Sequence, residues 1–327
     1  MSTNALRFDG QVAVITGAAG GLGRQYALLL ASRGARVVVN DTGGSVTGEG
    51  SSGAADAAAG EIREQGGDAV ADSHSVTNPE GAEAIVDTAL RTWGRVDILI
   101  NNAGIVGDAA FEDMTADRLE PLVDVHLKGA FYVTRPAWRV MREQRYGRVL
   151  NTTSAAGILG AERMSNYGAA KTGLLGLTRV LAAEGAEHGI KVNAIAPIAY
   201  TRMLTHSLDG ATGRPAVEND VAAQAVLDDL VGQYLQKLDP ALVAPVAAFL
   251  THRDCPVSGE IYTVGAGYVA RFFIGRTKGF YDPTLSIEDV RDHLDEIRDE
   301  AGYTTPGGPA DEMAELFATI AGQGVSR

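Results

Sequence analysis

The stretch QVAVITGAAGGLGR, residues 11–24, sets a short apolar run directly before a cluster of glycines. The run predicts a buried β-strand, and the Ala- and Leu-rich residues that continue to position 33 predict a helix. Glycine at positions 17, 21 and 23 would let the backbone turn sharply and approach a diphosphate, whose charge the free N–H groups of the helix start can meet. Alone, a glycine-rich turn is weak evidence, because many such turns only connect two elements. The stretch thus predicts a strand, a tight turn and a helix, with the turn as a candidate phosphate site.

Short β-branched runs alternate with longer, Ala-rich amphipathic stretches over most of the chain. Strands are predicted at 11–16, 35–40, 68–72, 96–101, 147–153, 190–196 and 259–265, and helices at 21–33, 54–65, 79–93, 114–142 and 165–187. This spacing implies right-handed βαβ units and a doubly wound, parallel α/β sheet. Ligands should then bind beyond the carboxyl ends of the strands.

Two segments depart from this alternation. Residues 203–238 lack strand patterns and place Gly, Pro and Asp between helical pieces, which suits a lid over a substrate pocket or, alternatively, a solvated surface insertion. Residues 269–327 begin with an aromatic and basic portion, RFFIGRTKGFY, and continue with acidic helical sequence. We expect one main domain, 1–268, and a C-terminal helical extension, 269–327, packed on that domain or on a neighbouring subunit.

An acidic residue closes the second predicted strand. Asp41 lies 24 residues after Gly17, close to the spacing of a carboxylate that binds both hydroxyls of an adenosine ribose. A carboxylate there repels the 2′-phosphate of NADP, and Thr42 follows it where an arginine would have favoured that phosphate. Gly20 adds no charge, and Arg24 is expected to face solvent or the helix surface. The pattern predicts NAD as the cofactor.

Composition limits the classes of partner. The chain has 327 residues and a formal net charge of -13, which argues against nucleic acid or an anionic membrane, because binding phosphate draws on clustered Lys and Arg. Cys255 is the only cysteine, so no internal disulfide can form and no Cys-based metal site is expected. The first ten residues contain no apolar core of a signal peptide, and no run is long enough to span a bilayer. We expect a cytoplasmic protein without a metal site.

A phenol and an ammonium lie four residues apart in YGAAK, residues 167–171. On a helix, Tyr167 and Lys171 share one face, and Ser154 in NTTSAAG lies thirteen positions upstream. The sequence NNAG, residues 101–104, closes the fourth predicted strand. Taken singly, each has an ordinary explanation: a surface pair on a helix, or a turn at a strand end.

Together these motifs resemble the short-chain dehydrogenase/reductase family over about residues 8–268. The resemblance implies a Rossmann fold with a seven-stranded sheet in the order 3-2-1-4-5-6-7 and helices on both faces. It implies that Tyr167 is the general acid/base toward the substrate oxygen, that Ser154 holds that oxygen, and that Lys171 binds the nicotinamide ribose and assists Tyr167. A cation near the phenol should also lower the pKa of Tyr167 toward neutrality.

The resemblance also implies a set of cofactor-binding residues. Pro197 corresponds to the first residue of the family's Pro-Gly turn, and Ile198 replaces the usual glycine, so Ile198 is expected against the nicotinamide. The predicted cofactor-binding residues are Gly17, Gly21, Leu22, Gly23, Asp41, Ser75, Val76, Asn102, Ala103, Gly104, Tyr167, Lys171, Pro197, Ile198 and Thr201.

His126 stands where most family members have an asparagine that holds a water in the proton relay to the lysine. Two interpretations stay open. Either His126 is a titrating, catalytic member of the relay, or it is a histidine packed and hydrogen-bonded within a helix.

The substrate is suggested by a closer resemblance, over about residues 6–280. VHLKGAF, YGRVLNTTSAAGILG, NYGAAKTGLLGL and the VGAGY that precedes the tail are similar to the (3R)-hydroxyacyl-CoA dehydrogenase subgroup found in peroxisomal multifunctional enzymes type 2. This implies an acyl-CoA substrate, with Arg271, Arg276 and Lys278 as candidate partners of its phosphates, or alternatively a tail that seals a subunit interface. The alternatives for function are a hydroxysteroid or other small-alcohol dehydrogenase and a non-catalytic NAD-binding scaffold. The family also implies a homodimer or homotetramer packed through the helices predicted at 114–142 and 165–187.

Overall fold

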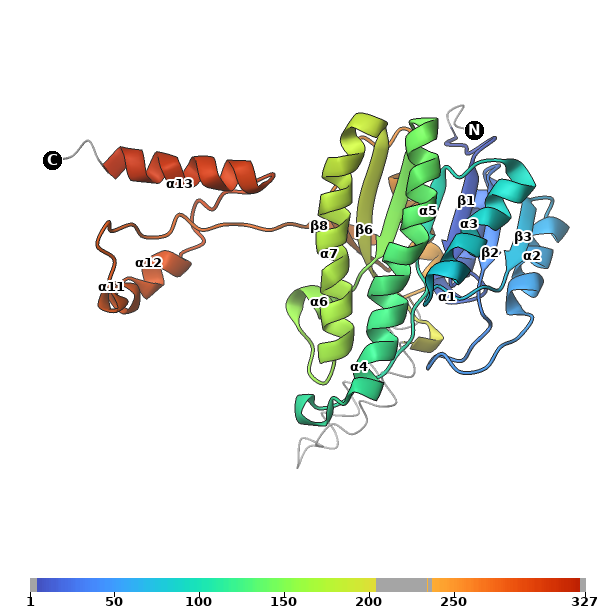
Figure 1. Ribbon diagram of the computed structural model, residues 1–327, viewed down its shortest axis with the longest axis horizontal. Helices are drawn as coiled ribbons and strands as arrows, with labels where there is room; N and C mark the ends of the chain where they lie inside the picture. The colour runs from blue at the N-terminus through green and yellow to red at the C-terminus, as the bar shows by residue number, and fades with distance from the viewer. Residues whose placement is uncertain (1–4, 204–233, 235–236, 324–327) are drawn as a thin grey trace. The chain divides into compact units, whose positions relative to one another are not determined.

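The computed structural model describes residues 5–203, 234 and 237–323. The chain divides into two compact units, Met1–Arg271 and Phe272–Arg327. The first contains the sheet, and the second contains three short to medium helices (Figure 1). The predicted lid, 203–238, lies outside the described residues except for positions 203, 234, 237 and 238.

The first unit is built on one sheet in the order β3-β2-β1-β4-β5-β6-β7-β8. Its strands are β1 (Val12–Thr16), β2 (Arg36–Asn40), β3 (Asp68–Asp72), β4 (Ile98–Asn101), β5 (Gly147–Thr152), β6 (Ile190–Ile198), β7 (Ile261–Gly265) and β8 (Tyr268–Phe272). The pairs from β3 through β7 are parallel, and Val14 stands opposite Val38 on one side and Leu99 on the other. The predicted α/β class and strand order are confirmed.

The sheet extends beyond the seven predicted strands, because β8 adds an eighth at its edge. A two-residue turn joins it to β7, with Ala266 at φ 49° and Gly267 at φ 77°. This turn suits a tight hairpin. Tyr268 and Val269 of β8 are exposed, so the strand lacks the buried apolar run by which the other strands were predicted.

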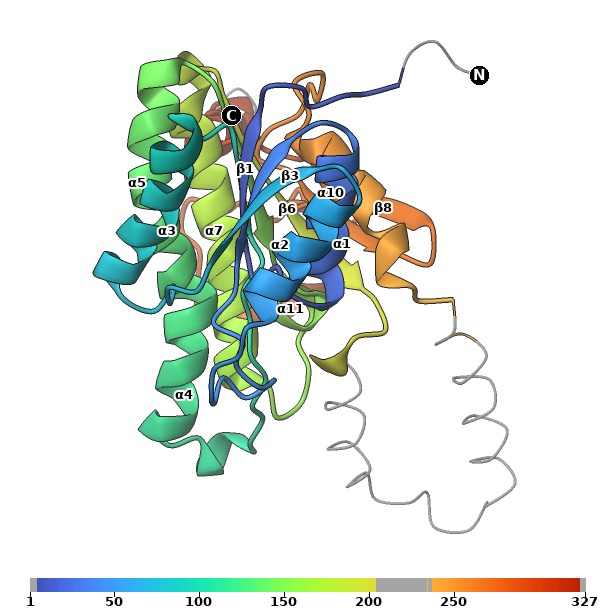
Figure 2. The same cartoon turned by 90° about the vertical axis from the view of Figure 1, so that its right-hand side faces the viewer.

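Helices cover both faces of the sheet, as Figure 2 shows in edge view. One face carries α1 (Gly21–Ser32), α2 (Ala54–Glu64) and α10 (Ala244–Thr251), and the other carries α3 (Pro79–Trp93), α4 (Ala116–Val123), α5 (Gly129–Gln144) and α7 (Ser165–Gly185). Shorter helices are η1 (Phe111–Asp113), α6 (Ala155–Leu159), η3 (Ala186–His188) and η4 (Pro240–Leu242). The helix predicted at 114–142 is interrupted by a π-helical turn, η2 (Asp124–Lys128), a feature often found at functional sites.

Alternating strand residues build a core on each face. In β1, Val12 and Val14 pack toward α3 and α5, whereas Ala13 and Ile15 pack toward α1 and α2, and all four are fully buried. Because both faces are covered, the polar carboxyl ends of the strands are the part of the sheet left to hold a ligand.

The second unit has its own internal contacts. It contains α11 (Ile287–Asp292), α12 (Leu294–Arg298) and α13 (Pro309–Gln323). Arg276 and Thr304 form an antiparallel bridge, and the Arg276 guanidinium pairs with Glu312 at 3.1 Å and Glu315 at 2.8 Å. The Phe273 and Tyr303 rings stack at 5.4 Å between centroids.

Candidate functional site

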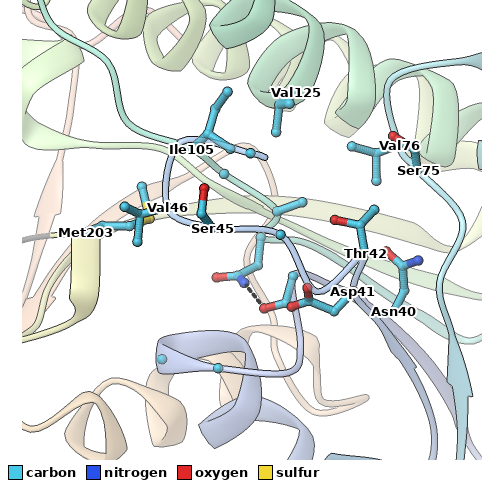
Figure 3. A pocket seen from close by; sticks show the side chains of 18 of the residues that line it. Asn40, Asp41, Thr42, Ser45, Val46, Ser75, Val76, Ile105, Val125 and Met203 are labelled. Carbon is cyan, nitrogen blue, oxygen red and sulfur yellow. Dashed lines mark hydrogen bonds between the residues drawn. The ribbon is translucent and has the colours of Figure 1, made fainter. Parts of the chain in front are cut away.

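A cavity of about 450 Å³ lies beyond the carboxyl ends of β1, β2 and β4. Figure 3 shows Val46 and Met203 toward one end of this cavity and Ser75 and Val76 toward the other, with Asp41 between. The predicted cofactor-binding residues that line it are Gly17, Gly21, Leu22, Asp41, Ser75, Val76, Asn102, Ala103, Gly104 and Thr201. Residues far apart in the sequence thus meet at the edge where a ligand was expected.

Gly23 does not line the cavity, but it allows the start of α1 to lie close to the strand ends that form the cavity floor. A Cβ at Gly23 would lie 2.2 Å from the Gly17 carbonyl oxygen and 2.6 Å from Asn102 Nδ2. Asn102 Nδ2 in turn donates to the carbonyls of Thr16 at 3.1 Å and Gly17 at 3.0 Å. The start of α1 can therefore approach β1 and β4 only with glycine at position 23.

Asp41 presents its carboxylate where the turn after β1 meets the loop after β2. Oδ2 accepts from the Ala19 N–H at 3.0 Å and Oδ1 from the Gly43 N–H at 2.8 Å, so both oxygens are held in place. Arg24 points away and pairs with Glu61 on α2, with Nε to Oε2 at 2.9 Å, which confirms its expected position on the helix surface. A glycine-rich turn opposite a fixed carboxylate fits the diphosphate and adenosine ribose of a dinucleotide.

The loop between Asp41 and α2 forms a cavity wall that sequence reasoning missed. Val46 O accepts from the Val106 N–H at 2.9 Å, and a Cβ at Gly48 would lie 3.2 Å from Ile105. The loop is therefore pinned to the segment after β4. The available signal was its length and glycine content in TGGSVTGEGSSG, residues 42–53, between the carboxylate and the next helix. The lining residues not predicted are Gly20, Asn40, Thr42, Gly44, Ser45, Val46, Gly48, Gly50, His74, Thr77, Ile105, Val125, Arg202 and Met203.

The predicted catalytic side chains come together between α6, α7 and β5. Ser154 precedes α6 and hydrogen-bonds the Tyr167 phenol. Lys171 is buried on α7, where its Nζ donates to the Thr152 carbonyl at 2.6 Å and lies 5.6 Å from the centroid of the Tyr167 ring. The spacing of one helical turn thus brings the phenol and the ammonium to one face, as expected.

Burial has the opposite effect on the tyrosine from the one expected. Desolvation raises the pKa of Tyr167 above its usual value, and the Ser154 hydrogen bond lowers it by less. Desolvation also lowers the pKa of Lys171 to about 7, so the ammonium itself is weakened as a partner for a phenolate. The expectation of a lowered tyrosine pKa is therefore not met, because it counted the cation and not the removal of water.

His126 lies in the π-helical turn η2 and is 2% exposed. Its Nε2 is 2.8 Å from the Ile105 carbonyl, and its ring meets the Tyr167 ring edge-on at 5.1 Å between centroids. Burial and the Lys171 charge lower its pKa well below the ordinary range, which favours a neutral imidazole at neutral pH. Gly104 allows this packing, since a Cβ there would lie 2.7 Å from His126 Cε1.

A second cavity of about 10 Å³ lies between His126, Asn101, Thr152 and Lys171. Among the described residues, three buried atoms at this cavity have no hydrogen-bond partner: His126 Nδ1, Asn101 Oδ1 and Thr152 Oγ1. A space of this size has room for one water molecule, and buried water commonly satisfies such groups.

Other predicted residues lie outside these cavities. Pro197 and Ile198 end β6 and are not among the described residues lining either cavity; the Ile198 side chain is exposed and stands opposite Gly265. Arg271 pairs with Glu260 at 2.9 Å, and Arg276 with two glutamates of its own unit, so two of the three candidate phosphate partners already face carboxylates.

Within residues 5–203, 234 and 237–323, His, Cys, Asp and Glu form no group of three or more that could hold a metal. No helix in the same described residues combines the length and apolarity needed to cross a bilayer.

Comparisons with known proteins agree with this geometry. The model of a family described as short chain dehydrogenase matches residues 11–210. Peroxisomal multifunctional enzyme type 2 of Mus musculus is 42% identical over 306 residues, which cover 92% of this chain and 38% of the mouse protein. A putative short-chain type dehydrogenase/reductase of Mycobacterium tuberculosis is 42% identical over 299 residues, which cover 91% of this chain and 97% of that protein.

Solved structures extend the comparison to the fold. Full-length peroxisomal multifunctional enzyme type 2 from Drosophila melanogaster matches with a TM-score of 0.76 at 34% identity, over 97% of this chain and 50% of that one. The chain thus spans half or less of these two multifunctional enzymes. The resemblance to them is confirmed. With the glycine-rich turn, the fixed Asp41 and the serine, tyrosine and lysine gathered at one sheet edge, the chain belongs to the short-chain dehydrogenase/reductase family of oxidoreductase enzymes.

Proposed function

We propose that this enzyme is an NAD-dependent dehydrogenase that interconverts a (3R)-3-hydroxyacyl-CoA and a 3-oxoacyl-CoA. The single observation that supports this best is the convergence of Ser154, Tyr167 and Lys171 beside a cavity whose turn and carboxylate fit a dinucleotide. The substrate class rests on the similarity to multifunctional enzymes over nine tenths of the chain. A Saccharomyces cerevisiae relative at 42% identity over 90% of this chain, named a peroxisomal hydratase-dehydrogenase-epimerase, points the same way.

The choice of NAD rests on charge. Asp41 would accept hydrogen bonds from the two ribose hydroxyls and repel a 2′-phosphate at the same place. The adenine would lie along Ser75 and Val76, and Gly104 and Thr201 would face the nicotinamide half. When bound, the nicotinamide supplies or accepts the hydride.

The residues of the chain would hold the substrate oxygen and move its proton. Ser154 donates a hydrogen bond to that oxygen and fixes it beside the phenol. Tyr167 takes the proton of the alcohol during oxidation and returns one to the carbonyl oxygen during reduction. Because burial raises the pKa of Tyr167, the ionised form depends on positive charge supplied within the complex, including protonated Lys171.

His126 would act as a positioning residue for the proton path. A water in the cavity of about 10 Å³ would accept from the Lys171 ammonium and bond His126 Nδ1, Asn101 Oδ1 or Thr152 Oγ1. The lowered pKa of His126 favours a neutral ring that orients this water without exchanging a charge at neutral pH.

Assembly and location complete the proposal. We expect a homodimer or homotetramer through α5 and α7, on which Phe131 and Val180 are 50% and 55% exposed. The extension 269–327 would pack on the main domain or a neighbouring subunit. We propose a cytoplasmic location. Cell fractionation with an antibody to the native chain would distinguish it from the peroxisomal location that the names of its relatives indicate.

The decisive experiment follows the absorbance of NADH with purified protein and three ketones: a medium-chain 3-oxoacyl-CoA, the same acyl group on pantetheine, and a steroid ketone. Turnover of the CoA thioester with a much lower KM than the pantetheine thioester supports the proposal. Turnover of the steroid alone, or equal KM for both thioesters, would refute the acyl-CoA substrate. The proposed interconversion of an alcohol and a ketone would stand. NADH binding without turnover of any ketone would favour the scaffold.

A further inference from the structure

Arg202 brings a positive charge to the glycine-rich turn from a distant part of the chain. It follows β6 and lines the main cavity, and its Nη2 lies 3.2 Å from the position that a Cβ of Gly20 would take. Gly20 is the residue directly before α1. The guanidinium therefore stands beside the positive end of α1, over the turn that fits a diphosphate.

The residues on either side of Arg202 show that the segment 201–203 crosses the glycine-rich turn. A Cβ at Gly21 would lie 3.5 Å from Thr201 Cγ2, one residue before Arg202, and Met203, one residue after it, lines the same cavity. Thr201 and Arg202 thus lie against consecutive residues of the turn. The segment is therefore close enough to contact a molecule bound in the main cavity.

The charge of Arg202 is not neutralised by a carboxylate of the described chain. None of the ion pairs found among the described residues includes Arg202; the nearest arginine of the glycine-rich turn, Arg24, pairs with Glu61. Among the described residues that line the main cavity, Arg202 is the only lysine or arginine. In a chain of net charge -13, a cation kept at this position is suited to an anionic ligand.

We propose that Arg202 binds the diphosphate of the dinucleotide, beside the N–H groups at the start of α1. This inference rests on the proposed dinucleotide site. It adds a phosphate-binding residue that lies outside the glycine-rich sequence motif. A guanidinium presents paired N–H donors in a plane, the arrangement that matches two phosphate oxygens.

The test measures binding and needs no turnover. Dissociation constants of NADH, ADP and adenosine are determined for the native chain, Arg202→Met, Arg202→Lys and the control Arg24→Met, with thermal unfolding to show that each variant folds. Arg202→Met should raise the constants of NADH and ADP about tenfold, because a charge-assisted hydrogen bond to phosphate is lost. Adenosine, which has no phosphate, should bind all four proteins alike, and Arg202→Lys should fall between.

Salt adds a second readout. The NADH affinity of the native chain should weaken more steeply with ionic strength than that of Arg202→Met. The reason is that the variant lacks the proposed ion pair between residue 202 and the diphosphate, which salt would screen. Arg24→Met should keep the native slope.

Three results would overturn the inference. Unchanged NADH and ADP binding in Arg202→Met would remove Arg202 from the diphosphate. A loss of affinity confined to NADPH, titrated in the same way, would assign it to a 2′-phosphate. Unchanged NADH and ADP binding with a raised KM for the CoA thioester, measured in the ketone assay described above, would assign it to the substrate. If the native chain bound no NADH, the proposed function itself would fail, and these variants would not be needed to show it.

Discussion

The main cavity lies next to the cluster of Ser154, Tyr167, Lys171 and His126, and the two regions differ in exposure to water. The cavity, about 450 Å³, is walled by glycine backbone, and its carboxylate, Asp41, is held by two backbone N–H groups. The cluster surrounds about 10 Å³ and buries Lys171 and His126, whose pKa values both fall. The first region would bind its ligand through shape and exposed backbone. The second adjusts proton affinity by removing water, so equal side-chain changes should have unequal effects in the two regions.

The largest effect is expected in the cluster. Tyr167→Phe removes the proton-transfer group and should lower kcat/KM about a thousandfold, within the range that general acid/base catalysis contributes. The affinity for NADH should change little, because the proposed role of the phenol is toward the substrate oxygen. Steady-state rates and fluorescence titration with NADH would measure the two effects. Activity of the variant within tenfold of the native value would place the proton transfer elsewhere.

In the cavity the largest effect should come from Gly23. Gly23→Ala places a Cβ 2.2 Å from the Gly17 carbonyl oxygen, and overpacking of this kind should cost about 3 kcal/mol of unfolding free energy. The matched control is Gly60→Ala on α2, where the nearest atom within 4 Å is the end of the Arg63 side chain at 3.8 Å. That substitution should stabilise by up to about 1 kcal/mol, because alanine is the better helix former. Urea unfolding would compare them, and equal stabilities would contradict the close approach.

Asp41 offers a change of specificity with little change of shape. Asp41→Asn keeps an acceptor for one N–H but removes the negative charge, so NADH should bind about tenfold more weakly and NADPH more tightly. Titration of both nucleotides would measure the ratio of their dissociation constants. A native protein that already bound NADPH more tightly than NADH would refute the assignment of NAD.

The most gradual effect is a dependence of stability on pH, because it is spread over several pH units. Burial lowers the pKa of Lys171 from 10.5 to about 7. Between these values the unfolded chain holds a proton that the native chain has lost, so the unfolding free energy should rise with pH, by at most about 1.4 kcal/mol per pH unit. Below about pH 7 both states hold the proton and this contribution to the slope disappears.

Denaturant midpoints of the native chain and Lys171→Met from pH 7 to 9.5 would isolate that contribution, since all other groups are shared. Parallel curves would mean that Lys171 keeps its proton when folded. For His126, whose pKa is also lowered, the corresponding rise belongs below pH 6.5, and His126→Asn should remove it.

Local signals explain where sequence reasoning succeeded. The helix predicted at 79–93 has the bounds of α3, because Asn78 caps the Gly81 N–H, Pro79 starts the helix and Gly94 ends it in the left-handed region. Asp41 and the glycines were likewise found by position relative to a strand end. By contrast, β8 was missed because an exposed edge strand has no buried apolar pattern.

The sequence by itself determined the alternation of strands and helices, the glycine-rich turn, the carboxylate after β2 and the phenol and ammonium one helical turn apart, because each depends on spacing within a few tens of residues. The order of the strands was implied by the resemblance to the family and not by spacing. Only the tertiary structure decided how much water reaches those groups. It buries Lys171, packs His126 against Tyr167, and sets Arg202 from the end of β6 over Gly20. Desolvation and close approach arise from segments that meet only after folding, so spacing along the chain contains no record of them.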